Sequence, residues 1–157
     1  MRRLIVRFVA AIVVLNLVLL AVAAVLKRVI PSQGDELSDE LALTAILDGV
    51  ELDSRAVAFR GGSAMACLGG IELDLTGATI AGGGVAELRI LAILGGVEIT
   101  VPDDWRVETA GTSLLGGVVN ATREASEGAP LLRIDATTVL GGVSIAQAPA
   151  ANGDWRA

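Results

Sequence analysis

The chain has 157 residues, of which 53% are apolar and only 3% aromatic, and its formal net charge is −6. Beyond position 34 it carries seven basic and eighteen acidic residues, a formal balance of −11, so it lacks the clustered basic face that binds nucleic acid. Histidine is absent, which excludes Ser-His and Cys-His catalytic pairs and most zinc sites of hydrolases. We therefore expect a protein that is not an enzyme and has no cofactor and no catalytic or metal-binding residues.

The first predicted element is an N-terminal membrane anchor, residues 1–30. Phe8 to Leu26 is a stretch of 19 residues without charge, and a helix of that length spans roughly the 30 Å of bilayer hydrocarbon. A cleaved signal peptide is the alternative, although the apolar stretch is longer than such peptides normally have. The larger positive charge before the segment favours placing the rest of the chain outside the cytoplasm. The flanking basic residues are Arg2, Arg3 and Arg7 before it and Lys27 and Arg28 after it.

Residues 31–40 are polar and acidic and contain Pro31 and Gly34, which predicts a short exposed linker. From residue 41 to residue 148 apolar residues recur at every second position of short segments, as in Val97, Ile99 and Val101. This period is typical of β-strands with one buried face. Residues 149–157 are predicted to form a flexible tail.

A glycine pair, or Asp48-Gly49 in the first copy, recurs five times in residues 41–148, at steps of 21, 26, 21 and 25 residues. Repeats of this length are typical of solenoids. We predict a mainly β fold, a single-stranded parallel β-helix with three short strands per coil, each coil lying on the one before it. The glycines would form its corners, where a missing Cβ allows positive φ and close backbone approach. They are Gly49, Gly69, Gly70, Gly95, Gly96, Gly116, Gly117, Gly141 and Gly142.

The same glycines could instead belong to a phosphate-binding loop. Such a loop lies between a strand and a helix and uses a lysine at a set spacing. Here a strand is predicted after each pair, and no lysine follows Lys27. The corner interpretation is therefore favoured, and it predicts that Gly96→Val damages folding.

Three glutamates, Glu51, Glu72 and Glu98, follow the second glycine of their repeats at the same distance. Strands in register would stack their side chains about 4.8 Å apart on the outer face, where like charges repel. A solvated acidic face is the favoured interpretation, and a shared calcium or magnesium ion is the alternative. The single cysteine, Cys67, is interpreted as a small core residue.

The segment Pro102, Asp103, Asp104 and Trp105 predicts a turn whose tryptophan covers the end of the core, with a ligand-stacking aromatic as the alternative. The sequence from Leu94 to Trp105, together with the later glycine pairs, resembles the C-terminal domain of LiaF-like proteins over about residues 41–147. That resemblance implies a membrane-tethered β-solenoid in the bacterial cell-wall stress response. Members of the family act with a membrane histidine kinase of a two-component system. They usually have several membrane helices, whereas one is predicted here.

The resemblance and the composition together predict a membrane-anchored regulator that acts by binding a membrane sensor kinase or a related envelope protein. The alternative is a scaffold resembling bactofilins, whose solenoids self-associate by stacking end to end. Charge, proline and glycine in the linker and the tail are expected to protect the strand edges at the two ends. This expectation favours the regulator.

Overall fold

A computed structural model describes residues 10–14, 17–18, 21–22, 24–25, 28 and 34–149. The chain divides into two units, residues 1–31 and 32–157. The described residues of the first unit are helical, and no helix within the described ranges is long and apolar enough to cross a membrane. Most of the predicted anchor, and all of the predicted tail except Pro149, lie outside the described residues.

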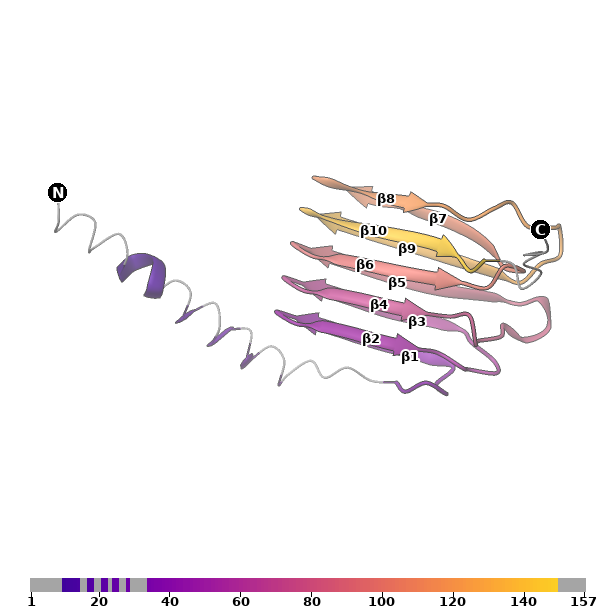
Figure 1. The fold of residues 1–157 in the computed structure, drawn as a ribbon, viewed down its shortest axis with the longest axis horizontal. Coiled ribbons are helices and arrows are strands. Elements are labelled where there is room, and N and C mark those ends of the chain that lie inside the picture. The colour runs from indigo at the N-terminus through magenta and orange to yellow at the C-terminus, as the bar shows by residue number, and fades with distance from the viewer. Residues whose placement is uncertain are drawn as a thin grey trace, which may run out of the picture. The chain divides into compact units, whose positions relative to one another are not determined.

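The second unit is built from parallel strands that stack as five coils, an arrangement that fits the predicted β-solenoid (Figure 1). Each coil has two strands joined by a sharp turn, so the expected three strands per coil are wrong. In chain order the coils are β1 (Glu40–Ile46) with β2 (Gly49–Asp53), β3 (Gly61–Cys67) with β4 (Gly70–Asp74), β5 (Val85–Ile93) with β6 (Gly96–Val101), β7 (Arg106–Ser113) with β8 (Gly116–Asn120), and β9 (Leu131–Val139) with β10 (Gly141–Gln147). One short 3-10 helix, Ala81–Gly83, precedes β5.

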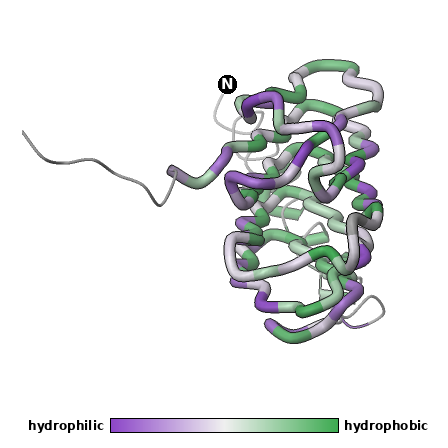
Figure 2. The backbone as a smooth tube through the Cα atoms, turned by 90° about the vertical axis from the view of Figure 1, so that its right-hand side faces the viewer, coloured by the Kyte–Doolittle hydropathy of each residue, from purple (hydrophilic) through white to green (hydrophobic). Residues whose placement is uncertain are grey.

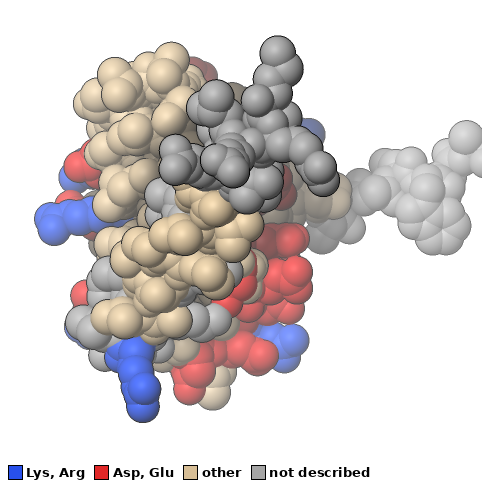
Figure 3. Space-filling model, turned by 90° about the vertical axis from the view of Figure 1, so that its left-hand side faces the viewer, with Lys and Arg blue, Asp and Glu red and all other residues tan. Residues whose placement is uncertain are grey.

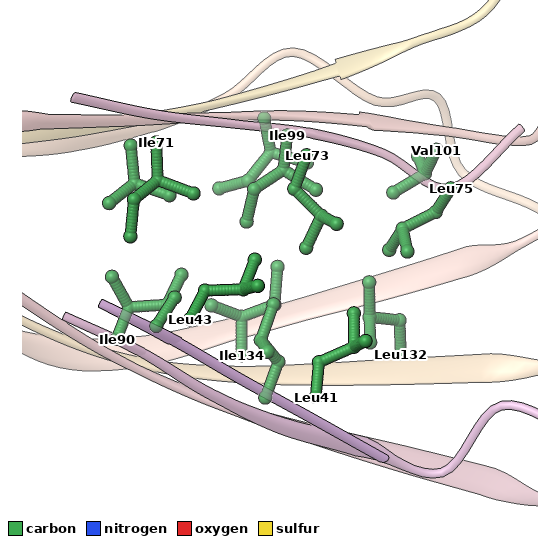
Figure 4. Packing of buried hydrophobic residues seen from close by; sticks show 14 of the residues in the cluster. Leu41, Leu43, Ile71, Leu73, Leu75, Ile90, Ile99, Val101, Leu132 and Ile134 are labelled. Carbon is green, nitrogen blue, oxygen red and sulfur yellow. The ribbon is translucent and has the colours of Figure 1, made fainter. Parts of the chain in front are cut away.

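The odd-numbered strands form one sheet and the even-numbered strands form the other, with the core between them. Along β9, Leu132, Ile134 and Ala136 are buried while the residues between them are exposed, as the alternating pattern predicts. Leucines and isoleucines of the two sheets face one another (Figure 4). Apolar and polar residues alternate along the stacked coils in Figure 2. Burying each such large side chain contributes about 1.5–3 kcal/mol, so the two inner faces hold the sheets together.

The order of the coils differs from their order in the chain. The odd sheet runs β1-β3-β5-β9-β7 and the even sheet runs β2-β4-β6-β10-β8. The fifth coil therefore lies between the third and the fourth, as the yellow strands between the red and orange ones show in Figure 1. The expectation that each coil lies on the one before it is wrong for the last two coils.

The inward residues explain this order. Opposite Ile134 and Ile145 of the fifth coil, both buried, the fourth coil has Thr109 and Asn120. Burying polar groups without partners costs free energy, so a coil with polar residues at these two positions suits the end of a stack, where both stay exposed, better than its middle. The Asn120 side-chain amide donates to the Val107 carbonyl at 3.4 Å, within the same terminal coil.

The two ends of the stack are formed by the first and fourth coils. At the first coil, residues of the predicted linker form hydrogen bonds with the loop between β2 and β3. Asp39 accepts hydrogen bonds from the backbone N–H groups of Ala58 and Arg60. In the same linker, hydrogen bonds from the Ser38 hydroxyl and the Leu37 N–H lower the pKa of Asp35.

At the other end, β7 and β8 each pair on one side only among the described strands. The last strand, β10, pairs on both sides, with β6 and β8. The tail therefore follows an inner strand, and the expectation that it follows a terminal one was wrong.

Candidate functional site: the turn edge

The first glycines of the pairs, here called the first-glycine column, are Gly69, Gly95, Gly141 and Gly116 in stack order. A Cβ at any of them would overlap a backbone carbonyl oxygen of the neighbouring coil. At Gly69 that oxygen belongs to Asp48, and at Gly95 it belongs to Gly69. Close stacking of the turns therefore requires these glycines.

The first coil shows why one of its turn residues is not a glycine. Each Cβ added to the first-glycine column would point toward the neighbour on the first-coil side of the stack. The first coil has no such neighbour among the described residues, and Asp48 occupies the position there. The restriction to glycine thus comes from the adjacent coil and not from the turn itself.

The second-glycine column behaves differently. A Cβ at Gly49 or Gly117 would meet nothing within 4 Å, and at Gly96 the nearest atom would be the Gly142 oxygen at 3.8 Å. None of the second glycines has a positive φ. Neither packing nor backbone conformation requires glycine at these places, so the expected folding damage from Gly96→Val has no support in the geometry. In stack order the column is Gly49, Gly70, Gly96, Gly142 and Gly117.

The residue before each pair is a leucine, and these leucines form a second line along the turn edge, here called the leucine row. Backbone hydrogen bonds from Leu47, Leu68 and Leu94 to the adjacent coil place them in stack order. Leu140 follows. It lies opposite Leu115, because Gly141 pairs with Gly116 and the two leucines directly precede these glycines. In stack order the row is Leu47, Leu68, Leu94, Leu140 and Leu115, with exposed fractions of 41%, 42%, 50%, 50% and 61%.

Four of these leucines have the positive φ that was expected at the glycines, at 61° for Leu47, 57° for Leu68, and 54° for Leu94 and Leu140. Among the predicted corner glycines only Gly116 has a positive φ. The left-handed conformation costs a residue with a Cβ roughly 1–2 kcal/mol. In these four coils the sharp turn is thus made by a leucine that is about half exposed.

The predicted stacking of the glutamates is confirmed by the strand register. Glu51 lies opposite Glu72, and Glu72 lies opposite Glu98, all three exposed on the outer face of the even sheet. We call them the acidic row. The fifth and fourth coils continue this line with Ser144 and Val119. In Figure 3, which views the turn end, acidic side chains gather on one side of the lower coils.

A shallow groove follows the second-glycine column beside the acidic row. Over the first three coils it has a volume of about 260 Å³, with Gly49, Gly70 and Gly96 among its lining residues. A further hollow of about 480 Å³ spans Gly96 to Gly117 and includes Val119. The two hollows share Gly96 and Glu98, and together they touch all five coils along a line that crosses the strands.

The acidic row has no charged partner among the described residues. Among the described residues, the ion pairs lie on the odd sheet and join Arg106 to Glu108, and Arg133 to Glu87 and Glu108. Within residues 34–149 and the described helical residues, no group of three or more Asp, Glu, Cys or His side chains could hold a metal ion. The structure therefore gives the calcium or magnesium interpretation no support.

The predicted turn at residues 102–105 lies at the other end of the coils, between β6 and β7. Trp105 is 1% exposed, and its ring stacks on Phe59 with centroids 6.1 Å apart. Asp103 and Asp104 are exposed, and Gln147 donates to the Asp103 carbonyl at 2.9 Å. The turn therefore covers the loop end of the core and lies away from the turn edge.

Two features were not resolved by the sequence. The interpretation of Cys67 as a small core residue is wrong, because Cys67 ends β3, is half-buried and lies outside the buried core cluster. The leucine row was missed altogether, although a leucine precedes every glycine pair, because an apolar residue beside a strand normally indicates the core.

Comparison with protein-family models, curated proteins and solved structures gives no match.

Proposed function

We propose that the chain is a non-enzymatic regulatory protein that binds another protein through its turn edge. The observation that carries the proposal is the leucine row, five leucines that are 41–61% exposed and aligned across five coils. Contiguous exposed apolar surface in a soluble domain commonly marks an interaction site.

Two residue choices along this edge support the proposal because the backbone at each place would accept another residue more readily. Glycine would adopt the left-handed turn position with less strain than Leu94, yet leucine is present there. A β-branched residue would suit the strand position of Gly96 better, yet glycine is present there. The edge therefore has leucines at turn positions where a Cβ causes backbone strain, and glycines at strand positions where a side chain would cause none. Binding of a partner gives both choices a reason.

The location and the partner class come from the sequence. The apolar segment between Phe8 and Leu26 supports a single-pass membrane anchor, with the coil stack on the extracytoplasmic side. The resemblance to LiaF-like proteins supports a role in the bacterial cell-wall stress response. On this proposal the partner is a membrane sensor kinase or a related envelope protein.

Photo-crosslinking in intact cells tests the proposal. A photoreactive phenylalanine analogue replaces Leu94 in the full chain, and a matched variant has it at Val57, which is 80% exposed in a loop at the other end of the coils. We expect a crosslinked protein from Leu94 and none from Val57. Equal crosslinking from both sites, or none from either, would contradict the proposal, and the crosslinked protein is then identified by mass spectrometry.

The scaffold remains a second candidate because of one observation. Strands β7 and β8 each leave one side without a strand partner among the described residues, and an open strand edge can pair with another chain. Electron microscopy of the purified full chain separates the two candidates. Extended filaments would favour the scaffold, and discrete particles would favour the regulator.

A further inference from the structure

We infer that the turn edge takes a basic, amphipathic α-helix of the partner protein, lying along the stack and crossing the coils. This inference rests on the proposed function and specifies the chemistry of its partner. It follows from three properties of the edge: the apolar leucine row, the charge of the acidic row and the spacing of the coils.

The leucine row sets the length of the partner segment. Five coils in parallel register give four steps of about 4.8 Å, so the row is roughly 19 Å long. An α-helix rises about 1.5 Å per residue, and about 13 residues would cover that distance. Apolar side chains three or four positions apart would form the stripe that contacts the leucines.

The spacing of the coils favours a helix over an extended segment. One face of a helix presents a side chain about every 5.4 Å, whereas one face of a strand presents one about every 6.8 Å. The three carboxylates of the acidic row lie about 4.8 Å apart and span about 9.6 Å. Across that span a helix deviates by roughly 1 Å and a strand by roughly 4 Å, so only the helix keeps one basic residue near each glutamate.

Charge complementarity identifies the helix as basic over part of its length. Glu51, Glu72 and Glu98 present three aligned carboxylates without an ion-pair partner among the described residues. Lysine or arginine on the partner would meet them at the first three coils. Ser144 and Val119 continue the line over the last two coils of the stack, so the facing part of the helix is uncharged. This asymmetry sets the direction in which the helix lies.

The second-glycine column allows the helix to approach. Between the leucine row and the acidic row it leaves a strip without side chains, along which the groove runs. A valine at Gly96 would project from this strip and displace the helix, although its Cβ would meet no atom of a neighbouring coil closer than 3.8 Å. Glycine at this place therefore serves the contact and not the fold.

The test uses designed helical peptides as probes for the full chain in nanodiscs of uncharged lipid. The probe has about 14 residues, with lysines at helical spacing along one half and leucines on the adjoining face. One control peptide has glutamate in place of lysine, and a second has a central proline that prevents the helix. Binding is measured by fluorescence anisotropy, at about 0.05 M and about 0.5 M salt.

We expect the lysine probe to bind, to bind more weakly in high salt, and to outcompete both control peptides. The variants Gly96→Val, Leu94→Asn and Glu72→Lys should each weaken its binding at least about tenfold. The matched variants Val57→Asn and Glu127→Gln, in exposed loops at the other end of the coils, should leave it unchanged. Circular dichroism confirms that every variant is folded.

Equal binding of the glutamate or proline peptide would overturn the inference, and so would equal losses in the matched variants. No binding of the lysine probe up to about 1 mM, an affinity of only about −4 kcal/mol, would also overturn it. If a protein is still crosslinked from Leu94 in cells in that case, the proposed function stands without the helix. If no protein is crosslinked either, both are refuted.

Discussion

The two glycine columns lie one residue apart along the chain, yet stacking of the coils requires glycine only in the first of them. The first column is closed, because a Cβ at Gly95 would overlap the backbone of the adjacent coil. The second column is open, because a Cβ at Gly96 would have ordinary contact distances. A repeated glycine is therefore not a single signal. In each pair one glycine is required by the stack, and the other leaves space on the surface.

The largest effect is expected in the closed column. Gly95→Val should destabilise the coil stack by at least about 3 kcal/mol or prevent folding, because the side chain overlaps the Gly69 carbonyl. Urea unfolding followed by circular dichroism measures the change. Gly96→Val, one residue away, is the control, and equal stabilities for the two variants would remove the distinction between the columns.

The leucine row predicts an effect of opposite sign. Leu94→Asn should leave stability unchanged or raise it by up to about 1 kcal/mol, because asparagine tolerates the left-handed conformation better and the leucine is half-exposed. Thermal and urea unfolding measure it. The buried Leu88, replaced in the same way, should cost several kcal/mol. A similar loss at Leu94 would mean that its side chain belongs to the core.

In the open column we expect a smaller change. Gly96→Val should alter the free energy of unfolding by less than about 1 kcal/mol and in the stabilising direction, because glycine in a strand is unfavourable. The same unfolding curves give the value. A loss above about 2 kcal/mol would show that the column is closed after all.

The smallest effect is expected in the acidic row. Glu72→Gln removes a charge between Glu51 and Glu98 and should stabilise the fold by a few tenths of a kcal/mol at low salt. The gain should vanish at about 1 M salt, where exposed charges are screened. Thermal unfolding at the two salt concentrations measures it, and a loss of stability would point to an attractive interaction between the glutamates.

The strand patterns and the stacking of the glutamates could be predicted from the sequence because both are local. Alternation in segments such as Val97, Ile99 and Val101 identifies a buried face, and equal spacing after each glycine pair places Glu51, Glu72 and Glu98 in line. The order of the last two coils could not be predicted, because periodicity does not show which coil packs on which. Thr109 and Asn120 place polar groups opposite Ile134 and Ile145, so the order depends on which neighbour best covers an apolar face.

By itself the sequence determined that the chain repeats, that its segments are strands with one apolar face, and that it is acidic beyond its first apolar segment. Only the tertiary structure decided that each coil has two strands and that the fifth coil lies between the third and the fourth. It also decided that the turn residue with a positive φ is a leucine in four of the coils. The physical reason is that a Cβ at Gly95 would overlap the Gly69 carbonyl oxygen of another coil, about 26 residues away in the chain. Contacts of that kind also set apart the surface on which the proposed function depends.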